Sequence, residues 1–127
     1  MSTSIVQLND STLAAVRREA DKLYLELSPA FVVKSIPDSE DTLWRQNGRI
    51  VLTDPEVDGE LPATPATITT SRIRLNQYAY VDMLPIPSES PGFIEVKLST
   101  ENGGPVTIQA EFLLLELDDV AKYIRHL

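Results

Sequence analysis

The sequence contains no cysteine, one histidine and no long apolar run. Without cysteine the chain forms no disulfide, and it offers neither a thiolate for a metal nor a thiol for nucleophilic catalysis. The lone His126 would leave a transition metal with carboxylates as its other ligands, which is a poor donor set. No segment approaches the roughly 18 apolar residues of a membrane-spanning helix, and residues 1–7 lack the basic and apolar regions of a secretion signal. We therefore expect a cytoplasmic protein without a cofactor.

Positive charge is also scarce. Eleven Lys and Arg face 19 Asp and Glu, which gives a net charge of −8. Such a charge repels the phosphates of nucleic acids and the head groups of anionic lipids, so we expect neither nucleic acid nor a membrane as partner. The acidity itself is explained first by solubility.

The 127 residues match the length of one ordinary domain, and we treat 1–127 as a single domain. Nine Pro and five Gly divide the chain into short segments, most of which alternate apolar and polar residues. This alternation has the period of half-buried strands. The sequence therefore predicts an all-β fold, an antiparallel β-sandwich or partly open barrel of about 7–9 short strands.

The clearest pattern is a hairpin between Phe93 and Leu117. Two alternating segments are separated by Asn102-Gly103, a pair suited to the positive φ angles of a type I′ turn. The second segment becomes apolar on both faces at 112–115. A strand covered on both faces is expected at the centre of its sheet.

Three segments allow more than one interpretation. In 11–20 the apolar residues have helical spacing, but we favour a hairpin with strands at 12–18 and 23–27. In 118–126 a short helix and an edge strand fit equally well. The proline-rich segment 83–91 is expected to be an extended crossing without strand pairing.

One acidic segment resembles half of a metal-binding loop. Asp54, Glu56 and Asp58 precede Gly59 at the spacing that begins an EF-hand calcium loop. The place of the obligatory bidentate glutamate is taken by Pro65, however. These three residues are weak metal candidates, and we expect a solvated acidic connection without a metal.

Aromatic residues supply the candidate ligand-binding site. Trp44, Tyr78 and Tyr80 fall in or beside expected loops, and Asp82 adds a carboxylate nearby. Exposed rings with polar neighbours bind sugars and other polar molecules, although the same rings can simply cover the end of a core. The chain has no nucleophile elbow, phosphate-binding glycine loop or dinucleotide fingerprint, so no catalytic residue is predicted and we expect a protein that is not an enzyme.

Several turn and core motifs are shared with a known set of proteins. They are Asn9-Asp10-Ser11, the segment from Asp21 to Val32 with leucines at 23, 25 and 27, and Leu84-Pro85-Ile86-Pro87 before Gly92. Through them the chain resembles a family of small uncharacterised bacterial proteins built of short β-strands. The resemblance implies a bacterial, cytoplasmic β-domain and supplies no activity. Asn9 stands where that family is expected to have a histidine, so no role for an imidazole carries over.

Two functions fit these observations. The first is a non-enzymatic protein-interaction module, either a subunit or an inhibitor of a bacterial complex, with a protein partner or a second copy as its target. The alternative is a domain that binds a carbohydrate or another small polar ligand through its exposed aromatic residues.

Overall fold

The computed structural model describes residues 2–118 and 120–127, and this part of the chain contains strands and no helix. No helix there is consequently long and apolar enough to cross a bilayer. The strands are β1 (Thr3–Gln7), β2 (Thr12–Glu19), β3 (Lys22–Leu27), β4 (Phe31–Ser35), β5 (Thr42–Arg45), β6 (Gly48–Thr53), β7 (Glu56–Asp58), β8 (Ala66–Leu75), β9 (Tyr78–Val81), β10 (Met83–Pro85), β11 (Glu89–Thr100), β12 (Gly103–Leu117) and β13 (Lys122–His126). The prediction of an antiparallel all-β fold is confirmed, whereas about 7–9 strands was too few because short strands such as β7 and β10 were not recognised.

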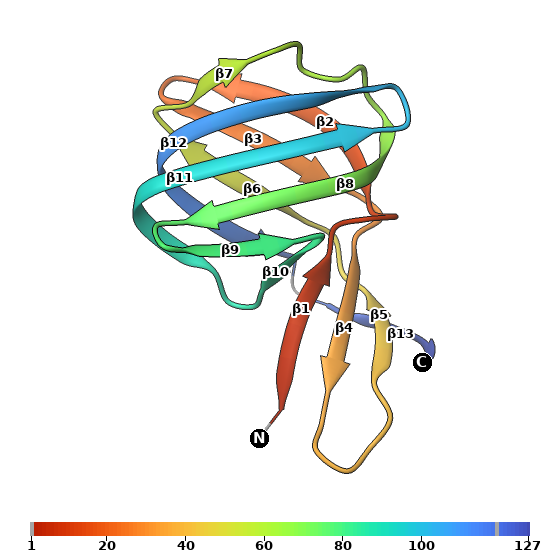
Figure 1. Cartoon of the computed structure of the whole chain (residues 1–127). Coiled ribbons are helices and arrows are strands. Elements are labelled where there is room, and N and C mark those ends of the chain that lie inside the picture. The colour runs from red at the N-terminus through yellow and green to blue at the C-terminus, as the bar shows by residue number, and fades with distance from the viewer. Residues whose placement is uncertain (1, 119) are drawn as a thin grey trace.

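Eight strands form a sheet that curls into a barrel (Figure 1). Six of them pair in the order β11-β12-β6-β3-β2-β8, and β8 also pairs with β11, which closes a ring. The junction between β2 and β8 is short, since only Thr12 with Thr67 and Leu13 with Ala66 are paired. In addition, β9 pairs with β8 and β7 pairs with β12.

The other five strands form a second sheet in the order β10-β1-β4-β5-β13, which we call the stalk sheet. Its strands β1, β4 and β5 project from one end of the barrel, and both ends of the chain lie with them (Figure 1). Its outer edge is β13, which pairs only with β5 in the described part of the chain.

A single hydrophobic cluster fills the barrel and extends into the root of the stalk sheet. Its barrel members come from alternate positions of the strands, as the period of a half-buried strand requires. The stalk contributes Val6, Val32 and Leu84, all fully buried. The largest fully buried side chains of the barrel strands are Leu13, Leu23, Leu25, Leu27, Leu52, Ile73, Ile94, Ile108 and Leu113.

The hairpin between Phe93 and Leu117 is confirmed, and both of its strands pair as expected from the alternation. β12 pairs with β11 on one side and with β6 on the other, so it is central, as its doubly apolar end predicted. The turn differs from the expected one. Thr100 pairs with Gly103, and the positive φ angles fall on Gly103 (143°) and Gly104 (129°).

The favoured N-terminal hairpin is also confirmed, and a helix at 11–20 is wrong. A bulge between Leu13 and Ala15 explains the helical spacing. Leu13 lies opposite Leu27 and Val16 opposite Leu25, so residues three apart in sequence face the same side. A bulge inserts one residue into a strand and converts a spacing of two into a spacing of three.

The helix considered for 118–126 is wrong as well, although Asp119 lies outside the described residues. Lys122–His126 is the edge strand β13, and it has a bulge between Tyr123 and Arg125. The crossing predicted for 83–91 is corrected at both ends. Met83–Pro85 pairs with β1, and β11 already begins at Glu89.

Candidate functional site

The four residues predicted to bind a ligand do not form one site. Trp44 lies on β5 in the stalk sheet, whereas Tyr78 and Tyr80 lie on β9 of the barrel. Asp82 follows β9 and does not line the cavity beside the two tyrosines. Only Tyr78 and Tyr80 are therefore brought together as the sequence suggested.

Trp44 is half-buried and is not an open platform for a ligand. The ring of Tyr123 packs against it edge to face, with 5.4 Å between the ring centroids. Lys34 places its Nζ 4.2 Å from the centroid of the indole, and the indole Nε1 donates a hydrogen bond to Thr42 Oγ1 at 2.8 Å. Trp44 thus holds β13 and β4 against β5.

Tyr78 and Tyr80 border a cavity of about 350 Å³. Tyr78 is 61% exposed, while Tyr80 is partly buried against the core. One wall is fixed by Asn76, whose Nδ2 donates to the carbonyl of Pro91 at 2.8 Å and whose Oδ1 accepts from the Phe93 amide at 3.0 Å. The remaining lining residues are Leu75, Gln77, Pro85, Pro87, Ser88, Glu89 and Ser90. We call this the aromatic cavity.

Asp82 stabilises a chain reversal. It has a φ of 58°, and its carboxylate accepts a hydrogen bond from the Ser71 amide at 2.8 Å. Its own amide donates to the carbonyl of Ser71 at 3.0 Å, and its carbonyl accepts from the Leu8 amide at 2.9 Å. Through these hydrogen bonds Asp82 connects β8 to the segment that follows β1.

The acidic segment with the spacing of an EF-hand loop is partly a strand. Glu56 and Asp58 are exposed on β7, which pairs with Thr107–Gln109 of β12. Asp54 precedes β7, and its hydrogen bond to Glu111 raises the pKa of that carboxyl, as does repulsion from Asp54 and Glu56. Across residues 2–118 and 120–127 no three His, Asp or Glu side chains are grouped so that they could hold a metal ion.

A run of exposed apolar residues lies along β13, a surface that sequence reasoning did not single out. All five residues of the strand are exposed, including Tyr123 (50%) and Ile124 (41%). Val120 before the strand and Leu127 after it are exposed as well. In the sequence, this surface was indicated only by the interpretation of 118–126 as an edge strand.

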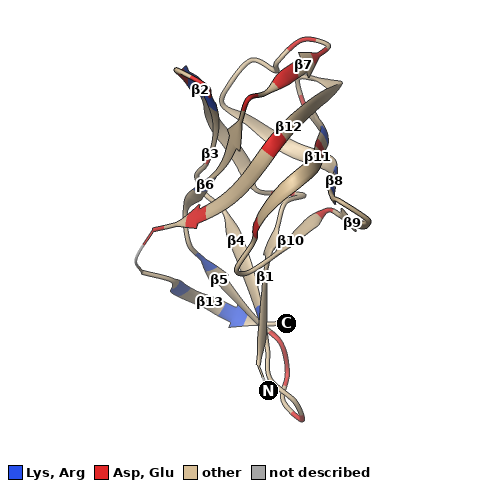
Figure 2. Cartoon of the chain, turned by 90° about the vertical axis from the view of Figure 1, so that its left-hand side faces the viewer, with Lys and Arg blue, Asp and Glu red and all other residues tan. Residues whose placement is uncertain are grey.

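The stalk sheet differs in charge from the rest of this acidic protein. Its five strands carry Lys34, Arg45, Lys122 and Arg125, and no Asp or Glu. Within the described residues none of these four cations forms an ion pair, in contrast to Arg49 of β6. In Figure 2 the cationic strands β5 and β13 lie toward one end of the molecule, where the loop between β4 and β5 carries acidic residues, and the acidic β7 lies at the other end.

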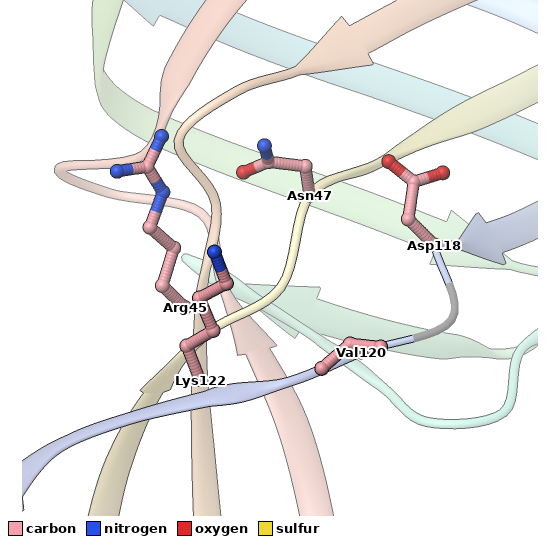
Figure 3. A pocket seen from close by; sticks show the side chains of 5 residues that line it. All are labelled: Arg45, Asn47, Asp118, Val120 and Lys122. Atoms are coloured by element: carbon pink, nitrogen blue, oxygen red, sulfur yellow. The ribbon is translucent and has the colours of Figure 1, made fainter.

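Three of these cations face the same side of the stalk sheet. Lys122 lies opposite Arg45, and the bulge places Arg125 opposite Leu43, two positions farther along β5. Arg45 and Lys122 line one side of a cavity of about 220 Å³, with Asp118 across from them (Figure 3).

A second cavity, of about 270 Å³, continues along the same side of the sheet. Its apolar lining comes from Phe31, Leu43 and Ile124, and the polar residues Gln7, Asp10 and Arg125 border it. Together with Arg45, Lys122 and the free edge of β13, these residues form what we call the stalk surface. This surface combines unpaired backbone groups, apolar side chains and cations.

No family, curated protein or solved structure matches the chain. The two surfaces must therefore be compared by their own chemistry. The aromatic cavity has one well-exposed ring and a rim of polar side chains and prolines. The stalk surface draws on β4, β5 and β13, and of the two surfaces it is the one that includes a strand with every residue exposed, as far as the described residues go.

Proposed function

We propose that this chain is a non-enzymatic protein-interaction module, a subunit or inhibitor of a bacterial complex in the cytoplasm, and that it docks through the stalk surface. The observation that carries the proposal is the exposure of β13 along its whole length at a sheet edge. An edge strand presents unpaired N–H and C=O groups to which another chain can add a strand.

Side chains around this edge supply the further contacts of such an interaction. Tyr123, Ile124 and Leu127 are apolar and exposed, and aromatic anchors are enriched at protein interfaces. Arg45, Lys122 and Arg125 add positive charge, which favours a partner with acidic side chains and increases the rate of encounter.

The proposal is tested by recovering tagged chain from the source cell and measuring the native mass of what accompanies it. The variant Ile124→Glu/Leu127→Glu removes apolar contact from β13 without touching the barrel. Val81→Glu is the control, because Val81 is also an exposed apolar residue (64%) but lies on β9 of the barrel. Circular dichroism checks that both variants keep the wild-type content of β-structure.

We expect a stoichiometric self-complex or hetero-complex with the wild type and with Val81→Glu, and its loss with the β13 variant. Recovery of a monomer alone, from a chain that also stays monomeric at about 1 mM in solution, would overturn the proposal. So would a complex that the β13 variant retains in full.

A second candidate function rests on the aromatic cavity. Its volume of about 350 Å³ suits a sugar ring, and Tyr78 offers an exposed face on which such a ring can stack. A glycan array tests it directly, with Tyr78→Ala and Tyr80→Ala as variants. Binding that both substitutions weaken supports this function, whereas no binding, or binding unchanged in both, removes it.

A further inference from the structure

The charges around β13 indicate which chain adds to this strand, an inference that rests on the proposed docking through the stalk surface. β13 carries Lys122 and Arg125, and Arg45 lies beside them on β5. Because like charges on facing strands are destabilising and opposite charges are favourable, the incoming strand should carry carboxylates. It should also place them at the spacing of the two β13 cations.

Pairing of β13 with β13 of a second copy does not meet this requirement. An antiparallel pair centred on Ile124 would place Lys122 opposite His126 and Arg125 opposite Tyr123. Two lysines and two arginines would then share one short ladder without a carboxylate. A symmetric dimer through this edge is therefore disfavoured.

The chain itself contains a strand of the required kind. β7 has the sequence Glu56-Val57-Asp58, and in the described part of the chain it pairs only with β12, so its other edge is free. Asp54 and Glu111 next to it add to the negative charge. β7 lies at the end of the barrel away from the stalk sheet in both views (Figures 1 and 2).

The spacing of the charges on the two strands agrees. Glu56 and Asp58 are two residues apart and face the same side of β7. Lys122 and Arg125 are three apart, but the bulge brings them to partner positions that are two residues apart on β5. An antiparallel pair would therefore set Glu56 against Arg125 and Asp58 against Lys122, with Val57 against Tyr123.

We propose that copies of this chain associate head to tail, with β7 of one copy adding to the β13 edge of the next. The two strands belong to different surfaces, so the contact is heterologous, and a pair of copies keeps one free β7 edge and one free β13 edge. Such contacts form a ring if their rotation closes and a filament if it does not. The contact is small and charged, which makes it weak and sensitive to salt.

Sedimentation velocity of the purified full chain tests the proposal, from about 10 µM to about 1 mM to cover weak association. It is measured at low salt and again at about 0.5 M NaCl, where exposed charges are largely screened. Lys122→Glu/Arg125→Glu makes the β13 edge acidic like β7. Glu56→Lys/Asp58→Lys makes β7 basic like the β13 edge. The control Arg72→Glu/Lys97→Glu changes the net charge as the first variant does, but at paired positions on β8 and β11.

We expect the wild type and the control to sediment faster as concentration rises at low salt, and high salt to abolish the increase. Each end-reversed variant alone should remain monomeric, and an equimolar mixture of the two should regain the wild-type behaviour. A wild type that stays monomeric at about 1 mM and low salt overturns the head-to-tail proposal. Association that survives either reversal, or a mixture that does not associate, overturns it too.

The failure of this inference is distinguishable from failure of the proposed function. A monomeric wild type that still recovers a partner lost in Ile124→Glu/Leu127→Glu keeps the stalk surface as a docking site and replaces the second copy with another protein. A monomeric wild type with no partner that depends on β13 removes both.

Discussion

Arg49 donates a hydrogen bond from its Nη2 to Asp118 Oδ1 at 2.9 Å. Its Nε donates to both carboxylate oxygens of Glu26 at 3.0 Å, and these acidic partners raise the pKa of the guanidinium. Around Asp118 the backbone is held as well, since its amide donates to the carbonyl of Asn47 at 2.8 Å. Arg49 thus fixes the point at which the chain leaves β12 of the barrel on its way to β13.

Replacing Arg49 with Met should lower the free energy of unfolding by about 1–2 kcal/mol, because Glu116 and Asp118 would lose their cation and Glu26 would keep only Arg17, at 3.6 Å. Urea denaturation measures the change. Arg49→Lys retains the charge but not the planar fork, so we expect a smaller loss. Equal stability of wild type and Arg49→Met would show that the network contributes nothing.

Tyr123→Ala should shift the fluorescence of Trp44 to longer wavelength. Trp44 is the only tryptophan, and the edge of Tyr123 covers its ring at 5.4 Å. Removing that ring admits water to the indole. Tyr24→Ala is the control, because Tyr24 contacts Arg17 in the barrel and lies on β3. An unchanged emission spectrum in Tyr123→Ala would mean that β13 does not cover Trp44.

Glu111→Gln should raise the melting temperature at neutral pH and have little effect in acid. In the wild type, the hydrogen bond and the charge of Asp54 raise the pKa of Glu111 in the folded state above the ordinary pKa of a glutamate. At a pH between the ordinary and the raised pKa, the folded state therefore binds more protons than the unfolded state. The stability contributed by Glu111 is therefore full below the ordinary pKa and is lost as pH rises through the raised one.

Glutamine retains a hydrogen bond to Asp54 without the charge. Melting curves from about pH 4 to pH 7 measure the difference between the two proteins. A variant that melts below the wild type at pH 7 would contradict the expected sign.

Ser71→Ala should stabilise the protein by up to about 1 kcal/mol. The Oγ of Ser71 is buried and has no hydrogen-bond partner, which is unique among the buried side-chain N and O atoms of the described residues. It lies among apolar neighbours that include Leu13, Ile68 and Ile73. A buried hydroxyl without a partner keeps its desolvation cost, and alanine removes it. Thermal unfolding measures the gain, and a fall in melting temperature would indicate that the hydroxyl is satisfied in solution.

Local pairing could be predicted from the sequence where it depended on adjacent segments. The hairpins at 12–27 and 93–117 are joined by short turns, so alternation and turn residues were sufficient. The two segments with helical spacing were ambiguous because each contains a bulge, at Leu13–Ala15 and at Tyr123–Arg125. A bulge gives a strand the spacing of a helix turn, and the sequence alone does not show which partner strand requires it.

The candidate sites depended on pairings between distant segments, which alternation does not specify. β13 joins β5, about 80 residues earlier, and this places Tyr123 over Trp44. The sequence therefore left open whether Trp44 is an exposed ring, and it is half-buried in a different sheet from Tyr78 and Tyr80. The clustering of cations on the stalk sheet could not be predicted from the sequence for the same reason, since Arg45 and Lys122 become neighbours only on folding.

The short junction between β2 and β8 gives the barrel a defined place at which to open. Beyond its two residue pairs, the backbone hydrogen bonds that reinforce it in the described part of the chain are those of Ile68 with Asp10 and Ser11, whereas β8 pairs with β11 from Ile68 to Leu75. Cooperative units with few bonds separate before the rest of a protein unfolds. The barrel should therefore open first where β2 meets β8. The amides of residues 66–68 should then exchange with solvent before those of the other barrel strands.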